Sequence, residues 1–223
     1  MCFMLTVSEE ILLLVIDDNS GEFLSLPIMA REHALAGAVL MDLAFAHRID
    51  SDQRDLILAD ATPTGDAILD EALAVIAAEK EKHSPKYWVE WFARQAADYE
   101  GSFLTRMVEK GILKKEEHRF LWVFASRRYP VINNAEEREV KFRISSVLFS
   151  DEIPGARDVA IISLASACNL LEEIFSAREV ASAQERIQQV CKMDLIGSAV
   201  FRAIADLRLN TMNSALQGPP LTI

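Results

Sequence analysis

The sequence predicts a mainly α-helical fold in a single domain, on the basis of three observations. Apolar residues make up 51% and charged residues 26% of the 223 positions, a balance typical of a globular chain that can bury one sizeable core. Apolar residues recur at three- and four-residue spacing in several segments, which is the pattern of amphipathic helices. Only 8 Gly and 7 Pro interrupt the chain. We expect one compact domain over residues 1–213 and a loose tail over 214–223.

Local signals predict where the helices of the first half begin and end. Thr6 and Glu9 can form a capping box ahead of an apolar run. Pro63 and Gly65 break the chain before Asp66, which can cap the next helix. The other helices expected in this half are Leu35–His47, a Trp-rich helix opened by Ser84 and Pro85, and Asp98–Lys110, which should end at a left-handed Gly111.

The second half is predicted to contain the central helix of the core. Val159–Leu171 is the longest apolar stretch, yet it is well short of the ~20 residues that a bilayer span needs. We therefore expect it to be buried, with amphipathic helices around it. Asn134 and Glu137 suggest another capping box, opening a helix that ends near residue 150. The remaining helices are expected at 157–175, 182–192 and 198–213.

A weak internal repeat predicts one or two β-hairpins. Residues 43–56 match residues 107–120 at a constant offset of 64 positions, and each copy reads as helix, turn, hairpin and helix. The hairpins are expected near 55–61 and over 119–131. Such a unit resembles a winged-helix element. Because the chain is acidic and neither copy carries a basic recognition helix, a packing module used twice is favoured over DNA binding.

The charge pattern disfavours nucleic acid and points to a different anionic partner. The net charge is −11 and the sequence pI is about 4.9, whereas phosphate backbones are bound by clustered Lys and Arg. The charge is uneven, because the segment from Arg106 to Arg143 carries +4 and the remainder carries −15. We expect no nucleic-acid partner, and we expect an anionic partner to approach this basic middle segment.

The sequence contains no motif for catalysis, a metal or a cofactor. Three widely spaced Cys predict neither a disulfide framework nor a zinc site, and the four His lack ligand spacing. Neighbouring residues on a helix point about 100° apart. Glu9 and Glu10 should therefore serve the helix N-terminus and solvation rather than acid–base chemistry. We expect a cytoplasmic protein that is not an enzyme and that uses no cofactor or metal.

The expected hairpin over 119–131 combines apolar residues with arginines. Phe120, Trp122 and Phe124 precede Arg127 and Arg128. Aromatic rings at headgroup level and cations on phosphates are the groups that an interfacial membrane contact uses. Two interpretations stay open: a membrane or self-association contact, the latter making a homo-oligomer, or a strand buried on both faces beside a solvated arginine turn.

Six segments resemble the Golgi phosphoprotein 3 family in the same order along the chain. The most specific is DATPTGDAILDEAL (60–73), and the others are LTVSEEILLLVIDDNSG (5–21), LAGAVLMDLAFAHRI (35–49), MVEKGIL (107–113), YPVINN (129–134) and LASACNLLEEIF (164–175). The resemblance implies a peripheral membrane protein that binds phosphatidylinositol 4-phosphate, with a hairpin region that supports self-association near the lipid site. Without the basic N-terminal extension of Golgi members, the chain looks like a prokaryotic, domain-only member.

The family's headgroup pocket uses one tryptophan and three arginines. When the resemblance is followed residue by residue, this chain has other residue types at all four positions. The four positions are Pro27, Ala36, Ala97 and Glu100. A glutamate there would repel a phosphate, and the bidentate arginine contacts are lost. Candidate replacements that lie nearby in the sequence are Arg31, Arg94 and Arg106. The alternative is that these three are surface arginines without a ligand.

Two functions follow from these observations. The first is a non-catalytic protein that binds phosphoinositide or another anionic lipid through the basic middle segment, as a peripheral membrane protein or adaptor. The second is a protein–protein scaffold of the same fold that has lost headgroup recognition, which the missing pocket side chains favour. The residues give no support to an unrecognised enzyme.

Overall fold

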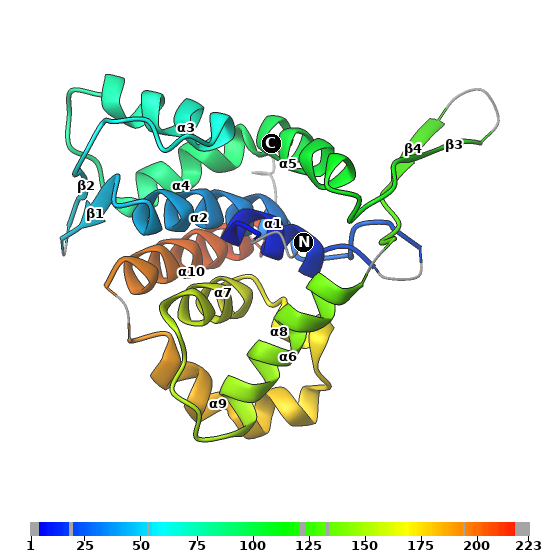
Figure 1. The fold of residues 1–223 in the computed structure, drawn as a ribbon. Helices are drawn as coiled ribbons and strands as arrows, with labels where there is room; N and C mark the ends of the chain where they lie inside the picture. The colour runs from blue at the N-terminus through cyan, green and yellow to red at the C-terminus, as the bar shows by residue number, and fades with distance from the viewer. Residues whose placement is uncertain are drawn as a thin grey trace, which may run out of the picture.

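Three buried helices form the centre of the molecule (Figure 1), as a computed structural model of residues 5–17, 20–52, 54–120, 124–132, 134–193 and 195–216 describes it. They are α1 (Val7–Leu14), α2 (Ala30–Phe45) and α7 (Ala156–Ala167), and each contacts the other two. All eight residues of α1 are buried. The helix that the sequence predicted as central therefore shares the core with two earlier helices.

The other described helices cover this centre on two sides. On one side lie α3 (Ala67–Ala78), α4 (Pro85–Arg94) and α5 (Ala96–Glu109), and on the other lie α6 (Ala135–Phe149), α8 (Leu171–Ile174) and α9 (Ala177–Val190) (Figure 1). α10 (Leu195–Leu216) packs along α2, α4 and α7. This confirms the predicted mainly α fold. None of the described helices combines the length and apolar character that crossing a membrane requires.

Two antiparallel hairpins project from opposite sides of the helical body (Figure 1). β1 (Ile49–Ser51) pairs with β2 (Leu56–Leu58), and β3 (Glu116–Phe120) pairs with β4 (Phe124–Arg128). The register places Ile49 opposite Leu58 and Glu116 opposite Arg128. Both predicted hairpins are thus present, but β1 precedes the expected range 55–61, β3 begins at Glu116 rather than at 119, and the strands of the two hairpins are not related by the offset of 64.

Most of the predicted caps are made as expected. The Oγ1 atom of Thr6 accepts a hydrogen bond from the Glu9 N–H at 3.2 Å, while Glu9 Oε2 accepts one from the Thr6 N–H at 2.8 Å. Asp66 caps α3 and Ser84 caps α4, each by accepting a backbone N–H. Gly111 follows α5 with φ +72°, the left-handed conformation that favours glycine.

Several boundaries differ from the sequence expectation, each for a local reason. Asn134 adopts φ −89° and ψ 14°, outside the extended conformation of an N-cap, and its side chain makes no cap bond. The predicted continuous helix over 157–175 breaks at Asn169, which adopts the left-handed φ of +60°. α9 begins earlier than predicted because Ser176 and Glu179 form a capping box. α10 includes residues 214–216, so the loose tail stays a prediction beyond them.

Gly37 marks a close approach of α2 to α7 and α10, and a substitution there should destabilise the fold. A Cβ at Gly37 would lie 2.5 Å from Leu164 Cδ2 and 3.0 Å from Val200 Cγ1. Gly37→Val should lower the free energy of unfolding by about 1–3 kcal/mol through overpacking. Gly101 of α5 is the matched control, since nothing lies within 4 Å of an added Cβ. Gly101→Ala should raise the free energy of unfolding by about 0.5–1 kcal/mol. Urea denaturation measures both, and changes of the same sign would contradict this packing.

Candidate functional site

Arg31 and Arg128, which the sequence assigned to two separate sites, lie around the same loop before α2. The guanidinium of Arg31 lies over the Phe23 ring, with Cζ 4.1 Å from the ring centroid. The same ring faces Tyr129 with 6.5 Å between centroids. Arg128 Nη2 lies 2.8 Å from Glu22 Oε1. These five residues are called the Phe23 surface below, and they bring a predicted headgroup residue next to a predicted hairpin residue.

A close backbone contact docks the loop before α2 onto the chain that follows β4. Gly21 has φ +66°, and an added Cβ would lie 2.4 Å from the backbone nitrogen of Pro130. The Gly21 carbonyl accepts a hydrogen bond from the Tyr129 N–H at 2.7 Å. Glycine alone fits both the left-handed conformation and this approach without strain. Gly21 therefore fixes the position of the Phe23 surface at the base of the β3–β4 hairpin.

Glu100 of α5 neutralises Arg31 at the place where the resemblance puts a family arginine. Arg31 Nε lies 3.0 Å from Glu100 Oε2, an ion pair whose N–H is not aligned for a hydrogen bond. The two side chains are 31% and 18% exposed. Burial raises the pKa of Glu100; the charge of Arg31 opposes this shift and the charge of Glu32 adds to it. The region thus retains a cation, but the cation is paired with an acid.

Arg106 belongs to a separate ion-pair cluster in the interior. Its Nε lies 2.9 Å from Glu9 Oε1, and its Nη1 lies 2.5 Å from Asp66 Oδ2. Lys110 Nζ approaches the same Glu9 oxygen at 2.7 Å. The Glu9 side chain has no exposed surface, so these cations compensate a fully buried carboxylate. Arg106 therefore links α1, α3 and α5.

Arg94 is separate from both of these regions. Its side chain is 71% exposed, and its ion-pair partner is Glu90, one turn earlier on α4, at 4.0 Å. The structure therefore brings Arg31 to the Phe23 surface, Arg106 into the interior cluster and Arg94 to an exposed helix face. Headgroup contact by any of the three stays a prediction.

The residues at the positions matched to the family pocket provide no positively charged side chain to bind an anion. Pro27 and Ala97 are exposed, and Ala36 is buried on α2. Ala97 lines an open groove of about 530 Å³ over α5. The predicted headgroup residue Arg106 also lines this groove, together with two carboxylates, Asp98 and Glu109, which would repel a phosphate. Sequence reasoning missed Phe23 as the aromatic ring that stacks on an arginine here, because only the folded loop brings the two together.

Much of the charge of the basic middle segment is directed inward. Arg143 Nη2 lies 2.7 Å from Glu10 Oε1, and Arg157 of α7 approaches the other Glu10 oxygen at 2.8 Å. Burial raises the pKa of Glu10, and the two arginines oppose this shift. The expectation that Glu9 and Glu10 are solvated is wrong, because both side chains are buried in α1 and paired with cations from other helices. A basic segment in the sequence is therefore not a basic surface.

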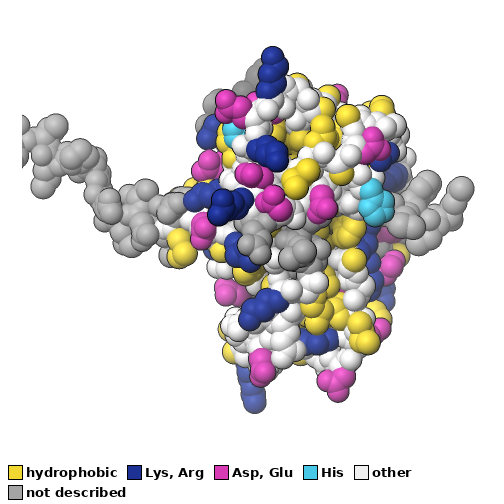
Figure 2. Space-filling model, turned by 90° about the vertical axis from the view of Figure 1, so that its left-hand side faces the viewer, with side chains coloured by type: hydrophobic (Ala, Val, Ile, Leu, Met, Phe, Trp, Pro, Cys, Tyr) yellow, Lys and Arg dark blue, Asp and Glu magenta, His cyan; other side chains and the backbone are white. Residues whose placement is uncertain are grey.

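The outer face gives no sign of a nucleic-acid or metal site in the part of the chain that is described. On the face shown in Figure 2, Lys and Arg side chains are intermixed with Asp and Glu rather than gathered into one field. No group of three or more His, Cys, Asp or Glu within the described ranges is arranged to hold a metal ion. Cys168 and Cys191 are buried free thiols.

The predicted hairpin contact can be placed by its backbone. Phe120 lies opposite Phe124 in the β3–β4 register, and Arg127 lies opposite Glu117. Trp122 is outside the described residues. A membrane or self-association role for these residues stays a prediction.

Comparison with known proteins adds two relationships. A family model described as Golgi phosphoprotein 3 (GPP34) matches residues 7–207, a span that includes the Phe23 surface. Vacuolar protein sorting-associated protein 74 of Eremothecium gossypii is 27% identical over 209 residues, covering 77% of this chain and 62% of that relative. The chain thus spans less than two thirds of the length of this curated relative.

Asp66 should act as a structural residue. Two substitutions can distinguish this role from a role in ligand binding. Its Oδ1 accepts the Ile68 N–H at 3.0 Å at the start of α3. Asp66→Ala should therefore lower the free energy of unfolding by about 0.5–2 kcal/mol. Asp66→Asn keeps a good cap and should recover the capping part of that loss, while the charged contact with Arg106 is removed in both variants. Urea denaturation measures both variants. A variant of normal stability that had lost vesicle binding would contradict this assignment.

Proposed function

The chain belongs to the Golgi phosphoprotein 3 family, and from this membership we propose that it is a non-catalytic peripheral membrane protein or adaptor that binds anionic lipid headgroups. Phosphatidylinositol 4-phosphate carries one such headgroup. The protein would bind it at the cytoplasmic face of the membrane. The observation that carries the proposal is the Phe23 surface, which combines an aromatic ring with two guanidinium groups. The printed name of the relative, which refers to protein sorting, supports an adaptor role.

Binding at the Phe23 surface requires a lipid phosphate to displace carboxylates from arginines. Arg31 and Arg128 are 31% and 36% exposed, so a phosphate can reach both. A phosphate offers more charge than a carboxylate and accepts bidentate arginine bonds. Glu22 is 48% exposed and can turn into solvent at low cost, whereas Glu100 is 18% exposed and competes more strongly. We therefore expect weak binding that declines as salt rises.

The β3–β4 hairpin supports the same orientation on a membrane. It projects from the helical body beside the Phe23 surface, because Arg128 ends β4 and Tyr129 follows directly (Figure 1). A membrane that contacts the arginines is therefore within reach of the hairpin. Phe120 and Phe124, which lie opposite each other where the two strands end and begin, would then enter the interface beside the headgroup.

A second function, a protein–protein scaffold without headgroup recognition, is favoured by one specific observation. Each of the three arginines predicted to bind a headgroup already has a carboxylate partner. Arg31 is paired with Glu100, Arg94 with Glu90, and Arg106 with both Glu9 and Asp66. If these pairs do not open, the family fold persists without its ligand. A stoichiometric protein partner together with silent lipid assays would select this function.

Vesicle co-sedimentation tests the first function. At low salt the protein should bind phosphatidylcholine vesicles that contain phosphatidylinositol 4-phosphate or phosphatidylserine, and not pure phosphatidylcholine. The double variant Arg31→Ala, Arg128→Ala should lose about tenfold or more in affinity, because each charge-assisted contact contributes about 1.5–3 kcal/mol. Arg178→Ala, on the exposed face of α9, is the matched control and should bind normally. Absence of binding to every anionic vesicle would refute the proposal.

The same assay should depend on pH through Glu100. The pKa of this carboxyl is raised, so mild acid neutralises Glu100 before an ordinary glutamate and removes the nearer of two carboxylates beside Arg31, the other being Glu32 at 3.9 Å. Binding should therefore strengthen as pH falls through the raised pKa of Glu100. Glu100→Gln should bind more tightly at neutral pH and lose that part of the pH dependence. Equal pH profiles for the parent and Glu100→Gln would show that Glu100 does not control Arg31.

A further inference from the structure

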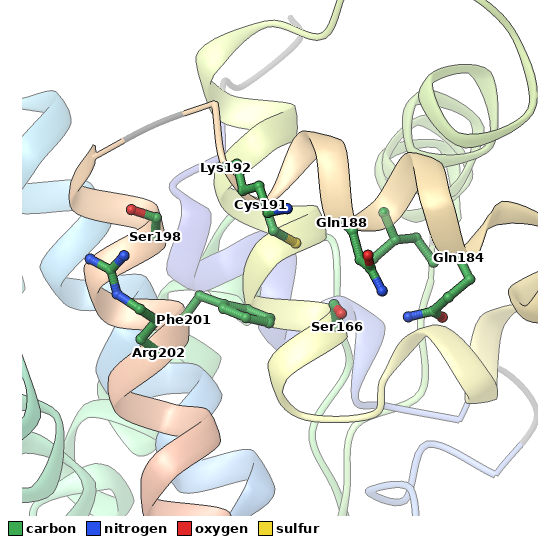
Figure 3. A pocket seen from close by; sticks show the side chains of 9 residues that line it. Ser166, Gln184, Gln188, Cys191, Lys192, Ser198, Phe201 and Arg202 are labelled. Carbon is green, nitrogen blue, oxygen red and sulfur yellow. The ribbon is translucent and has the colours of Figure 1, made fainter.

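A second cleft lies between α7, α9 and α10, on elements that take no part in the Phe23 surface (Figure 3). Its volume is about 400 Å³, within the range of about 300–1,000 Å³ that small-molecule sites occupy. α7 supplies Ser166, α9 and the residues after it supply Gln184, Gln188, Cys191 and Lys192, and α10 supplies Phe201 and Arg202. These side chains come from three helices and converge on one space.

The middle of the cleft is apolar and uncharged. The Phe201 ring extends from α10 toward Ser166 of α7, and Ile187 of α9 adds an aliphatic side chain (Figure 3). Cys191 is 5% exposed. Burial raises the pKa of its thiol, and the nearby hydroxyls of Ser163 and Ser166 oppose the shift. The thiol stays neutral at physiological pH and does not repel an anion.

The two ends of the cleft differ in polarity. Gln184 and Gln188 are one turn apart on α9 and lie at one end, Arg202 lies at the other, and Lys192 lies next to Cys191 between them (Figure 3). None of the described lining residues is acidic. Neither Lys192 nor Arg202 has an ion-pair partner within the described ranges, in contrast to Arg31 and its partner Glu100. Lys192 and Arg202 thus give the cleft a positive charge that no described lining carboxylate offsets.

We propose that this cleft binds a small amphipathic organic anion, with its apolar body against Phe201 and Ile187 and its anionic head beside Lys192 and Arg202. A carboxylate and a phosphate monoester share this chemistry, since Arg binds both in a bidentate manner. The amides of Gln184 and Gln188 accept or donate hydrogen bonds to a polar group at the far end. The site is independent of membrane binding, because it takes a single soluble molecule into an interior cleft.

Calorimetric titration with decanoate, decyl phosphate and 1-decanol tests this site. At least one of the two anions should bind, and 1-decanol should bind about tenfold more weakly or worse because it lacks the charge that Lys192 and Arg202 meet. Amide NMR shifts on binding should concentrate at Ser166, Cys191 and Phe201. If only decanoate binds, the anionic head of the ligand is a carboxylate. If only decyl phosphate binds, it is a phosphate.

Exposed cations can be changed without disturbing the core, which keeps the test decisive. The double variant Lys192→Gln, Arg202→Gln should lose about tenfold or more in affinity for the anion, and Arg178→Gln of the same α9 should lose none. Vesicle binding by the double variant should equal that of the parent, which separates this site from the Phe23 surface. Equal affinity for 1-decanol and the anions, no binding of any probe, or an unchanged double variant would overturn the proposal.

Discussion

Two adjacent carboxylates on a fully buried helix constrain the arrangement of the whole molecule. Glu9 and Glu10 are each paired with cations inside the protein, and these cations come from α5, α6 and α7. Asp42 of α2 adds a third carboxylate at the start of the same helix, where it accepts the Val7 N–H at 2.7 Å and the Ser8 N–H at 3.0 Å. α1 is therefore tied by charge or hydrogen bonds to four other helices, which all must take fixed positions around it.

Because cations are paired with these buried carboxylates, the charge of a sequence segment does not give the charge of the surface that it forms. The basic middle segment supplies Arg106, Lys110 and Arg143 to buried carboxylates, so much of their charge is already compensated. The cations that remain accessible are distributed differently, with Arg31 and Arg128 at the Phe23 surface and Arg202 at the α9–α10 cleft. The proposed anion recognition depends on which cations are not paired with buried carboxylates, rather than on the regional net charge.

Features that depend on neighbouring residues were predictable from the sequence, and features that depend on distant ones were not. The capping box at Thr6 and the turn at Gly111 follow from local chemistry, and both are present. The pairing of Glu9 with Arg106 joins positions 97 residues apart, and no local pattern distinguishes it from a solvated helix start. The end of the helix at Asn169 was not predicted, because the residues around it are apolar and fit a continuous helix. The Phe23 surface likewise exists only after the loop before α2 docks onto the end of β4.

The position of α10 governs when the core can close during biosynthesis. Arg208 of α10 donates hydrogen bonds to the Ala167 carbonyl and to Asn169 Oδ1, at the point where α7 ends. The same helix packs along α2 and α4, which are made far earlier. A nascent chain on the ribosome therefore presents the apolar sides of α2 and α7 to solvent until α10 has left the exit tunnel.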